Sequence, residues 1–186
     1  MTSNVLSEND IQSNMQSQVS VQDYSAQPTI DGVKIVELRS FTDDGGFFLE
    51  LNRWQDHVMQ DFPDFELKQM NYSEMDPGVI KAWHLHFHQE DIWFVPPMHK
   101  LLINLHDVRE NSPTKDVNMR LVFGVGKARL LYIPRGVAHG AANLWKKPAA
   151  IIYFVNNQFT PDPAITDEHR LPWDAFGTTI WEMARG

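Results

Sequence analysis

Short apolar runs of strand length recur along most of the chain, about every 8–12 residues, with turn residues rather than a helical repeat between them. One such turn is Asp76-Pro77-Gly78, where proline fixes φ and glycine permits a positive φ. This spacing is typical of an all-β sandwich or barrel and argues against alternating strands and helices. Short helices are expected only at the flanks, over Arg53–Phe62 and Trp173–Ala184. The runs expected to form strands are Val33–Leu38, Phe47–Arg53, Leu67–Ser73, Val79–Phe87, Ile92–Val95, Leu101–Val108, Arg120–Phe123, Arg129–Ile133, Ala141–Leu144 and Ala149–Phe154.

The first 28 residues differ from the rest of the chain. They consist mainly of Ser, Gln, Asn, Asp and Val, and they contain neither Lys nor Arg. Such a segment buries too little apolar surface to offset its ordering entropy, so residues 1–28 are expected to form a disordered N-terminal tail. The alternative is that Val19–Val21 forms a strand that pairs with a partner chain. Residues 29–186 are expected to form a single domain.

The composition excludes several classes of protein. The chain has no cysteine, which rules out a disulfide framework, a Cys-ligated metal centre and a thiol nucleophile, and which fits a reducing cytoplasm. Its 16 Lys and Arg against 24 Asp and Glu give a net charge of −8 without a basic run, so no nucleic-acid partner is expected. No apolar stretch is long enough to span a membrane, and the segment Met1–Tyr24 lacks the pattern of a signal peptide. We therefore expect a cytoplasmic protein with no membrane partner.

Eight histidines are the other unusual feature, and three of them are crowded into His84-Leu85-His86-Phe87-His88. Residues two apart on a strand project to the same face, so these three imidazoles are expected to point the same way. A packed apolar interior gains nothing from adjacent titratable rings, whereas a cavity inside a barrel can use them. The alternative is an exposed face on which the histidines are tolerated. About 50 residues on, the turn at Pro134-Arg135-Gly136 delivers His139 to the start of another strand.

These two segments resemble the two motifs of the cupin superfamily. The first motif fits Gly78, His84, His86 and Glu90, although Pro96-Pro97-Met98 occupies the place of its final glycine. The second motif fits Pro134, Gly136, His139 and Asn143 at the spacing of that superfamily. The resemblance implies an all-β, cupin-type jelly roll, or double-stranded β-helix.

A further set of segments resembles the dTDP-4-dehydrorhamnose 3,5-epimerase family, which has the cupin fold. The similarity extends from about residue 33 to residue 173. The segments that carry it are Phe41–Glu50, Gln69–Ser73, Lys81–His84, Asp107–Arg109 with Ser112–Thr114, Leu131–Gly140, and Tyr153 with Pro161. The chain is thereby identified as a divergent member of this family.

The resemblance implies epimerisation of a nucleotide-linked 4-keto-6-deoxy sugar without a metal or another cofactor. Inversion at carbon needs a base on one face of the sugar ring and an acid on the other. The positions that match the family make His84 the base, Asp167 its carboxylate partner and Tyr153 the opposing acid. The expected substrate-binding residues are Gln69, Asn71, Lys81, His86 and His139. Together with the exposed edges of the strands, the resemblance also implies a homodimer with N-terminal strands at its interface.

The chain departs from the family at several positions, and the departures leave two alternatives open. Gly45 and Lys81 replace arginines of the family, Gln158-Phe159 replaces a pair of tyrosines, and the family's lysine falls near Ile92 or Trp93. One alternative is a non-catalytic sugar-binding protein that has kept the fold. The other is a metal-dependent cupin, because imidazole and carboxylate groups bind Fe, Mn, Ni or Zn. Its ligands would be His84, His86, Glu90 and His139.

Overall fold

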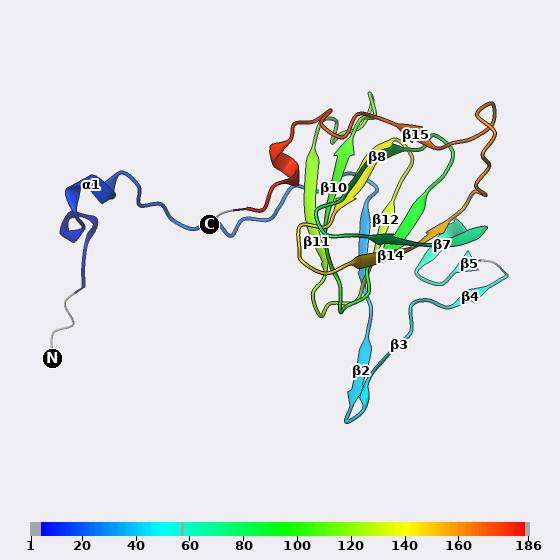
Figure 1. Ribbon diagram of the computed structural model, residues 1–186, viewed down its shortest axis with the longest axis horizontal. Coiled ribbons are helices and arrows are strands. Elements are labelled where there is room, and N and C mark those ends of the chain that lie inside the picture. The colour runs from blue at the N-terminus through cyan, green and yellow to red at the C-terminus, as the bar shows by residue number, and fades with distance from the viewer. Residues whose placement is uncertain (1–4, 57, 185–186) are drawn as a thin grey trace.

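Residues 5–56 and 58–184 are described by the computed structural model, in which two five-stranded antiparallel sheets form the body (Figure 1). The first sheet has the order β1 (Lys34–Glu37), β12 (Arg129–Ile133), β9 (Asp91–Phe94), β14 (Ala149–Val155) and β7 (Gln69–Met75). The second has the order β11 (Asn118–Gly124), β10 (Lys100–Asp107), β13 (Val137–Ala142), β8 (Ile80–Leu85) and β15 (His169–Arg170). The all-β prediction is confirmed.

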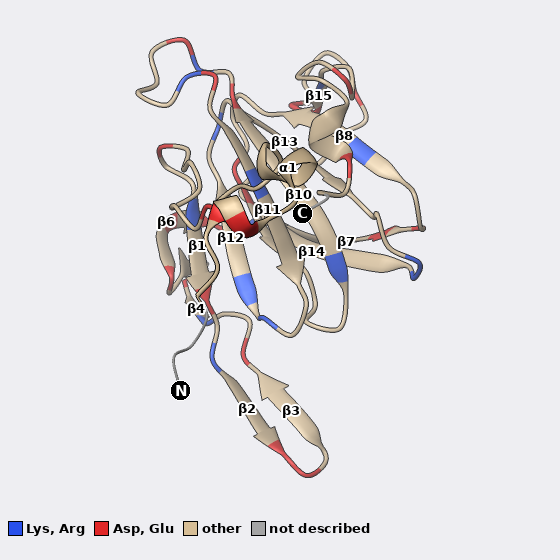
Figure 2. Cartoon of the chain, turned by 90° about the vertical axis from the view of Figure 1, so that its left-hand side faces the viewer, with Lys and Arg blue, Asp and Glu red and all other residues tan. Residues whose placement is uncertain are grey.

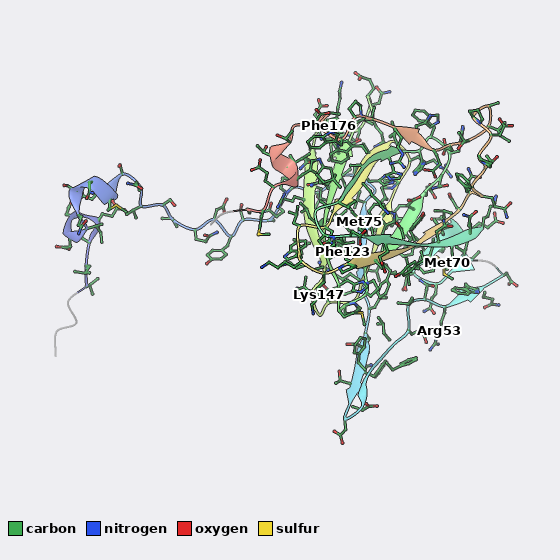
Figure 3. The ribbon with its side chains drawn as sticks, in the orientation of Figure 1. Arg53, Met70, Met75, Phe123, Lys147 and Phe176 are labelled. Carbon is green, nitrogen blue, oxygen red and sulfur yellow. The ribbon has the colours of Figure 1, made fainter. Side chains whose placement is uncertain are left out.

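The main core lies between these two sheets and contains residues from both, among them Met75 and Phe123, which are labelled in Figure 3. Strand β9 shows how alternation divides the apolar side chains. Trp93 packs in the core between the sheets, whereas Ile92 and Phe94 pack on the outer face of the first sheet. Both faces of β9 are therefore covered, and this explains why its sequence is apolar on consecutive residues.

The outer face of the first sheet is covered by a small sheet of β4 (Trp54–Gln55), β5 (Val58–Met59) and β6 (Phe62–Glu66). The helix expected over Arg53–Phe62 is therefore wrong. Met59, Phe62 and Phe65 are buried against Ile92 and Phe94, and this packing decides the local structure in place of a weak helical pattern.

The outer face of the second sheet is covered by the C-terminal segment. The helix expected over Trp173–Ala184 is wrong apart from one 3₁₀ turn at Thr179–Trp181. Trp181 is buried against Trp83 of β8, with ring centroids 4.8 Å apart. The indole N–H groups of Trp83 and Trp181 both donate to the backbone oxygen of Trp173, at 3.0 and 2.9 Å respectively. These contacts hold an irregular segment in place without a helix.

The N-terminal part of the chain leads away from the two sheets (Figure 1). It contains a 3₁₀ turn at Glu8–Asp10 and the short helix α1 (Ser13–Gln16), and its described residues before Ile30 are exposed except Gln16. Among the described residues, Ile30 is the first along the chain that is buried. The division into a disordered tail (1–28) and one domain (29–186) stays a prediction, and residues 1–4 and 185–186 lie outside the described residues.

A hairpin of β2 (Ser40–Asp43) and β3 (Gly46–Leu49) projects from the body, and its tip is acidic (Figure 2). Phe41, Phe47 and Phe48 on this hairpin are exposed. The described part of the chain includes no helix that is long and apolar enough to cross a membrane.

Candidate active site

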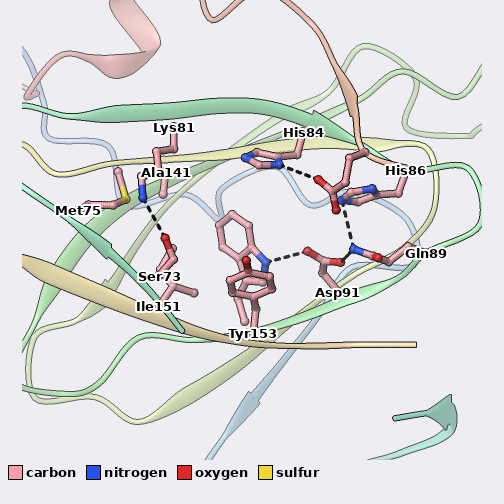
Figure 4. Close-up of a pocket in the computed structure, with 12 residues that line it drawn as sticks. Ser73, Met75, Lys81, His84, His86, Gln89, Asp91, Ala141, Ile151 and Tyr153 are labelled. Carbon is pink, nitrogen blue, oxygen red and sulfur yellow. Dashed lines mark hydrogen bonds and ion pairs between the residues drawn. The ribbon is translucent and has the colours of Figure 1, made fainter. Parts of the chain in front are cut away.

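A cavity with two chambers lies between the sheets, and Figure 4 shows its inner chamber. The inner chamber has a cavity volume of about 90 Å³ and the outer chamber one of about 340 Å³. His84, Gln89, Tyr153 and Glu168 line both chambers. The inner chamber is completed by Ser73, Met75, Lys81, His86, Asp91, Trp93, Ala141 and Ile151. The outer chamber is completed by Gln69, Asn71, Val155, Phe159 and Arg170.

Three histidines meet at this cavity, although not the three that the alternation predicts. His84 alternates on β8 with Trp83 and Leu85, which pack on the outer face of the sheet and so turn His84 inward. The ring of His84 stacks on that of His139, its register partner on β13, with centroids 5.7 Å apart. The ring of His86 lies 5.2 Å from that of His139. His88 is exposed, because the strand ends at Leu85 and the alternation ends with it.

His84 is held by two charged side chains. Its Nδ1 lies 3.7 Å from Oε2 of Glu168, and its Nε2 lies 2.8 Å from Nη1 of Arg170. Burial lowers the pKa of His84, and the pairing with Glu168 opposes only part of that effect. The same pairing keeps the pKa of Glu168 below its ordinary value. His84 is therefore neutral at neutral pH, as a general base must be.

Asp167 does not fill the place expected for it. Its carboxylate accepts hydrogen bonds from the backbone N–H groups of Phe87, His88 and Gln89, at 3.0, 2.8 and 2.7 Å. Burial alone would raise the pKa of Asp167, but these three bonds hold it below its ordinary value. The structure thus places Asp167 as the cap of the loop after β8, and the carboxylate beside His84 belongs to Glu168. The reason is the strand register. Arg170 pairs with His84 across the two strands, and Glu168, two residues before Arg170, lies on the same side of the chain as Arg170.

Asp91 is a buried anion that the sequence reasoning missed. It accepts hydrogen bonds from Nε2 of Gln89 at 2.8 Å and from Nε1 of Trp93 at 3.0 Å. Burial would raise its pKa, but His139, whose Nε2 lies 3.6 Å from Oδ2, together with the charge of His86 and the hydrogen bond from Trp93, lowers the pKa to about 2. The sequence signal that could have pointed to Asp91 is its place as a single carboxylate directly before the apolar run Ile92–Val95.

His86 and His139 each use Nδ1 to donate to a backbone oxygen, that of Asp167 at 2.7 Å and that of Val137 at 2.9 Å. In a neutral ring, Nε2 is then left as an acceptor. Two groups of side chains hold ligand atoms within 4.8 Å of one another, as a metal ion requires, namely His84, His86 and Glu168, and His86, Asp91 and His139.

Glu90, the carboxylate of the expected metal set, belongs to neither group. Its Oε2 accepts from Nδ2 of Asn156 at 2.9 Å, and its Oε1 lies 3.5 Å from Nη2 of Arg135. The expected set is therefore wrong in its carboxylate.

Tyr153 lies on β14, on the opposite side of the inner chamber from His84 (Figure 4). Burial raises the pKa of Tyr153, and the anionic Asp91 raises it further. The phenol therefore keeps its proton at neutral pH and can donate it. The cavity thus has a neutral imidazole on one wall and a protonated phenol on the other.

Four of the five expected substrate-binding residues, Gln69, Asn71, Lys81 and His86, line the cavity, whereas His139 is buried behind His84 and lines neither chamber. Nε2 of Gln69 donates to Oδ1 of Asn71 at 2.7 Å, and both residues line the outer chamber. Lys81 lines the inner chamber, where its ammonium donates to Oγ of Ser73 at 3.0 Å and to the backbone oxygen of Glu74 at 2.8 Å. Sequence reasoning missed Gln89, Asp91, Glu168 and Arg170.

Comparison with known proteins places this geometry in a family. Residues 27–181 match the family model described as dTDP-4-dehydrorhamnose 3,5-epimerase. The chain is 43% identical over 145 residues to the spore coat polysaccharide biosynthesis protein SpsL of Bacillus subtilis, covering 78% of this chain and 91% of that protein. Among solved structures it is similar to a dTDP sugar isomerase from Desulfovibrio desulfuricans G20, at 27% identity and a TM-score of 0.67 over 83% of this chain and 91% of the other.

A second similar structure is the dTDP-6-deoxy-D-glucose-3,5-epimerase of Legionella pneumophila in complex with dTDP-4-keto-L-rhamnose. It matches at 25% identity and a TM-score of 0.62, over 73% of this chain and 72% of the other. These similarities confirm the predicted cupin-type jelly roll. The chain belongs to the dTDP-4-dehydrorhamnose 3,5-epimerase family, a family of sugar-nucleotide epimerases.

Proposed function

We propose that this protein epimerises a dTDP-linked 4-keto-6-deoxy sugar by removing and returning a proton next to the ketone. The observation that carries the proposal is the pair of His84 and Tyr153 on opposite sides of one chamber. One of these groups is a neutral base and the other is a protonated acid at neutral pH. Inversion of a carbon next to a carbonyl needs such a pair.

In this reaction, Nε2 of His84 takes the proton from the carbon next to the ketone. The electron pair of the C–H bond moves into the ring, and the ketone oxygen becomes the enolate oxygen. When the enolate collapses, the carbon takes a proton from the hydroxyl of Tyr153 on the other face. The phenolate then regains a proton from water, and the imidazolium of His84 releases its proton to water. Glu168 stabilises the imidazolium that His84 forms between the two proton transfers, because its carboxylate lies beside Nδ1.

The outer chamber is the proposed site of the nucleotide. Gln69 and Asn71 provide amide groups that suit the edge of a pyrimidine base. Lys81 provides positive charge at the inner chamber, where it would contact substrate.

The Bacillus subtilis relative is named for spore coat polysaccharide biosynthesis, which supports a place in surface polysaccharide biosynthesis. The description of the matching family, dTDP-4-dehydrorhamnose 3,5-epimerase, supports deoxysugar biosynthesis with rhamnose as the sugar. We propose that the protein acts in the cytoplasm as a homodimer. The projecting β2–β3 hairpin supports the dimer, because its exposed Phe41, Phe47 and Phe48 offer apolar surface that a second copy would cover.

The proposal is tested by incubating the protein in deuterium oxide with a panel of dTDP-linked 4-keto sugars and following incorporation by mass spectrometry. We expect deuterium at one or both carbons next to the ketone, and loss of exchange by at least about 10²-fold in His84→Ala. His88→Ala is the matched control, because His88 belongs to the same run of histidines but is exposed. Binding without exchange across the panel would instead support a sugar-binding protein.

The same preparation decides between this mechanism and a metal-dependent cupin. Protein purified without a histidine tag is assayed for bound metal and then treated with a chelator. We expect exchange to continue unchanged after chelation. A stoichiometric metal that disappears in His86→Ala together with exchange would overturn the metal-free mechanism.

A further inference from the structure

Arg170 covers the nitrogen of His84 that must act as the base. Strand β15 pairs with β8 so that Arg170 lies opposite His84, and Nη1 of Arg170 lies 2.8 Å from Nε2 of the imidazole. Arg170 also lines the outer chamber, and its side chain is exposed. The guanidinium therefore lies at the point where a substrate must approach His84.

The hydrogen-bonding capacity of the two groups fixes the tautomer of His84. A guanidinium has only N–H donors, so Nε2 of His84 must accept from it. The ring proton is then on Nδ1, which faces the carboxylate of Glu168 at 3.7 Å. In the free protein, the lone pair that would take a proton from carbon is consequently occupied by Arg170, and it must be released before the reaction can begin.

The reaction also needs a positive group at the ketone oxygen, because an enolate places negative charge there. Two cationic side chains, Lys81 and Arg170, line the described parts of the two chambers. The ammonium of Lys81 is held by the hydroxyl of Ser73 and by the backbone oxygen of Glu74, and Figure 4 shows its contact with Ser73. Arg170 already touches the base. The ketone oxygen lies two bonds from the carbon that loses its proton, so it falls beside the base as well.

We propose that Arg170 is a catalytic residue that moves its hydrogen bond from His84 to the ketone oxygen of the bound substrate. This exchange has two effects in one motion. It frees Nε2 to take the proton, and it places a guanidinium on the oxygen that becomes negative. The inference rests on the proposed epimerisation and adds to it the group that stabilises the enolate.

The test compares Arg170→Gln and Arg170→Lys with the wild type in the deuterium exchange assay. We expect kcat to fall by about 10²–10³-fold in Arg170→Gln, the usual effect of losing a donor to an oxyanion, with KM changed by less than about threefold. Arg170→Lys keeps the positive charge, so its kcat should be at least about tenfold higher than that of Arg170→Gln. Arg53→Gln is the matched control, because Arg53 is an exposed arginine paired with Glu50, away from the cavity.

Two outcomes would overturn the inference while the proposed function stands. One is an Arg170→Gln variant that exchanges at the wild-type rate. The other is a variant whose loss lies wholly in KM, which would make Arg170 a binding group rather than a group that acts in the reaction. Thermal unfolding of each variant confirms that the fold is intact. Absence of exchange in the wild type itself would remove the proposed function and this inference with it.

Discussion

Two imidazole–carboxylate pairs lie side by side in this protein, and they differ in their access to water. His84 and Glu168 have side chains that are 22% and 33% exposed, with Nδ1 and Oε2 3.7 Å apart. His139 and Asp91 are 2% and 4% exposed, with Nε2 and Oδ2 3.6 Å apart. The rings of the two histidines stack almost in parallel, at 10°. The chain has thus placed an accessible pair and a buried pair next to each other with nearly the same separation.

The difference shows how one type of pair can serve two purposes. The accessible pair lines both chambers, so its histidine can exchange a proton with a bound molecule. The buried pair is fixed by Gln89 and Trp93, which leaves the carboxylate ionised and the local field constant. That fixed negative charge helps Tyr153 to keep its proton. We infer that the buried pair sets the field in which the accessible pair works.

The largest expected effect comes from breaking the buried pair with Asp91→Asn. The carboxylate accepts from Gln89 on one oxygen and from Trp93 on the other, whereas the amide has one acceptor oxygen, so a buried donor is left without its partner. The amide also removes the negative charge that faces Nε2 of His139. We expect the free energy of unfolding to fall by about 3–5 kcal/mol, measured by urea denaturation. Glu90→Gln is the matched control and should cost about 1 kcal/mol or less, because Glu90 interacts with Asn156 and the exposed Arg135 outside the chamber. Equal losses in the two variants would contradict the assignment of Asp91 as the buried partner.

The next effect separates the two neighbouring carboxylates of the C-terminal segment. Glu168→Gln removes the charge beside Nδ1 of His84, and we expect kcat to fall by about 10²-fold. Asp167→Asn leaves His84 untouched but weakens the cap on Phe87, His88 and Gln89, so it should cost about 1–3 kcal/mol of stability and less than about tenfold in kcat. Steady-state kinetics and urea denaturation measure the two effects. The reverse pattern would restore Asp167 as the partner of the base.

The sequence was sufficient to predict the main sheets, because apolar residues alternate along their strands in a pattern that a two-layered β structure buries. It was not sufficient for Arg53–Phe62, where helix propensity and the burial of Met59 and Phe62 favour different structures. In such a short segment, burial against a sheet formed by distant residues outweighs local helix propensity, and the local sequence does not indicate that this sheet is present.

The site shows the same limit at the level of single residues. The histidines at 84, 86 and 139 could be found because their spacing matches two motifs. The partner of His84 could not be found, because the choice between Asp167 and Glu168 depends on the register of β15, a strand of two residues. A shift of one residue along a strand exchanges the faces of all its side chains, and no sequence pattern fixes the register of so short a strand.

The smallest effect concerns the pH at which the accessible pair begins to work. Burial lowers the pKa of His84 below 6.5, Glu168 raises it, and the charges of Arg170 and of the stacked His139 lower it. The base is active when neutral, so activity should rise as pH increases through this pKa. Removing Arg170 as Arg170→Gln should move this rise to higher pH, whereas Glu168→Gln should move it to lower pH. Profiles of log(kcat/KM) against pH measure the direction of both shifts. If both variants shifted the pH profile in the same direction, Arg170 and Glu168 would not have opposite effects on the pKa of His84.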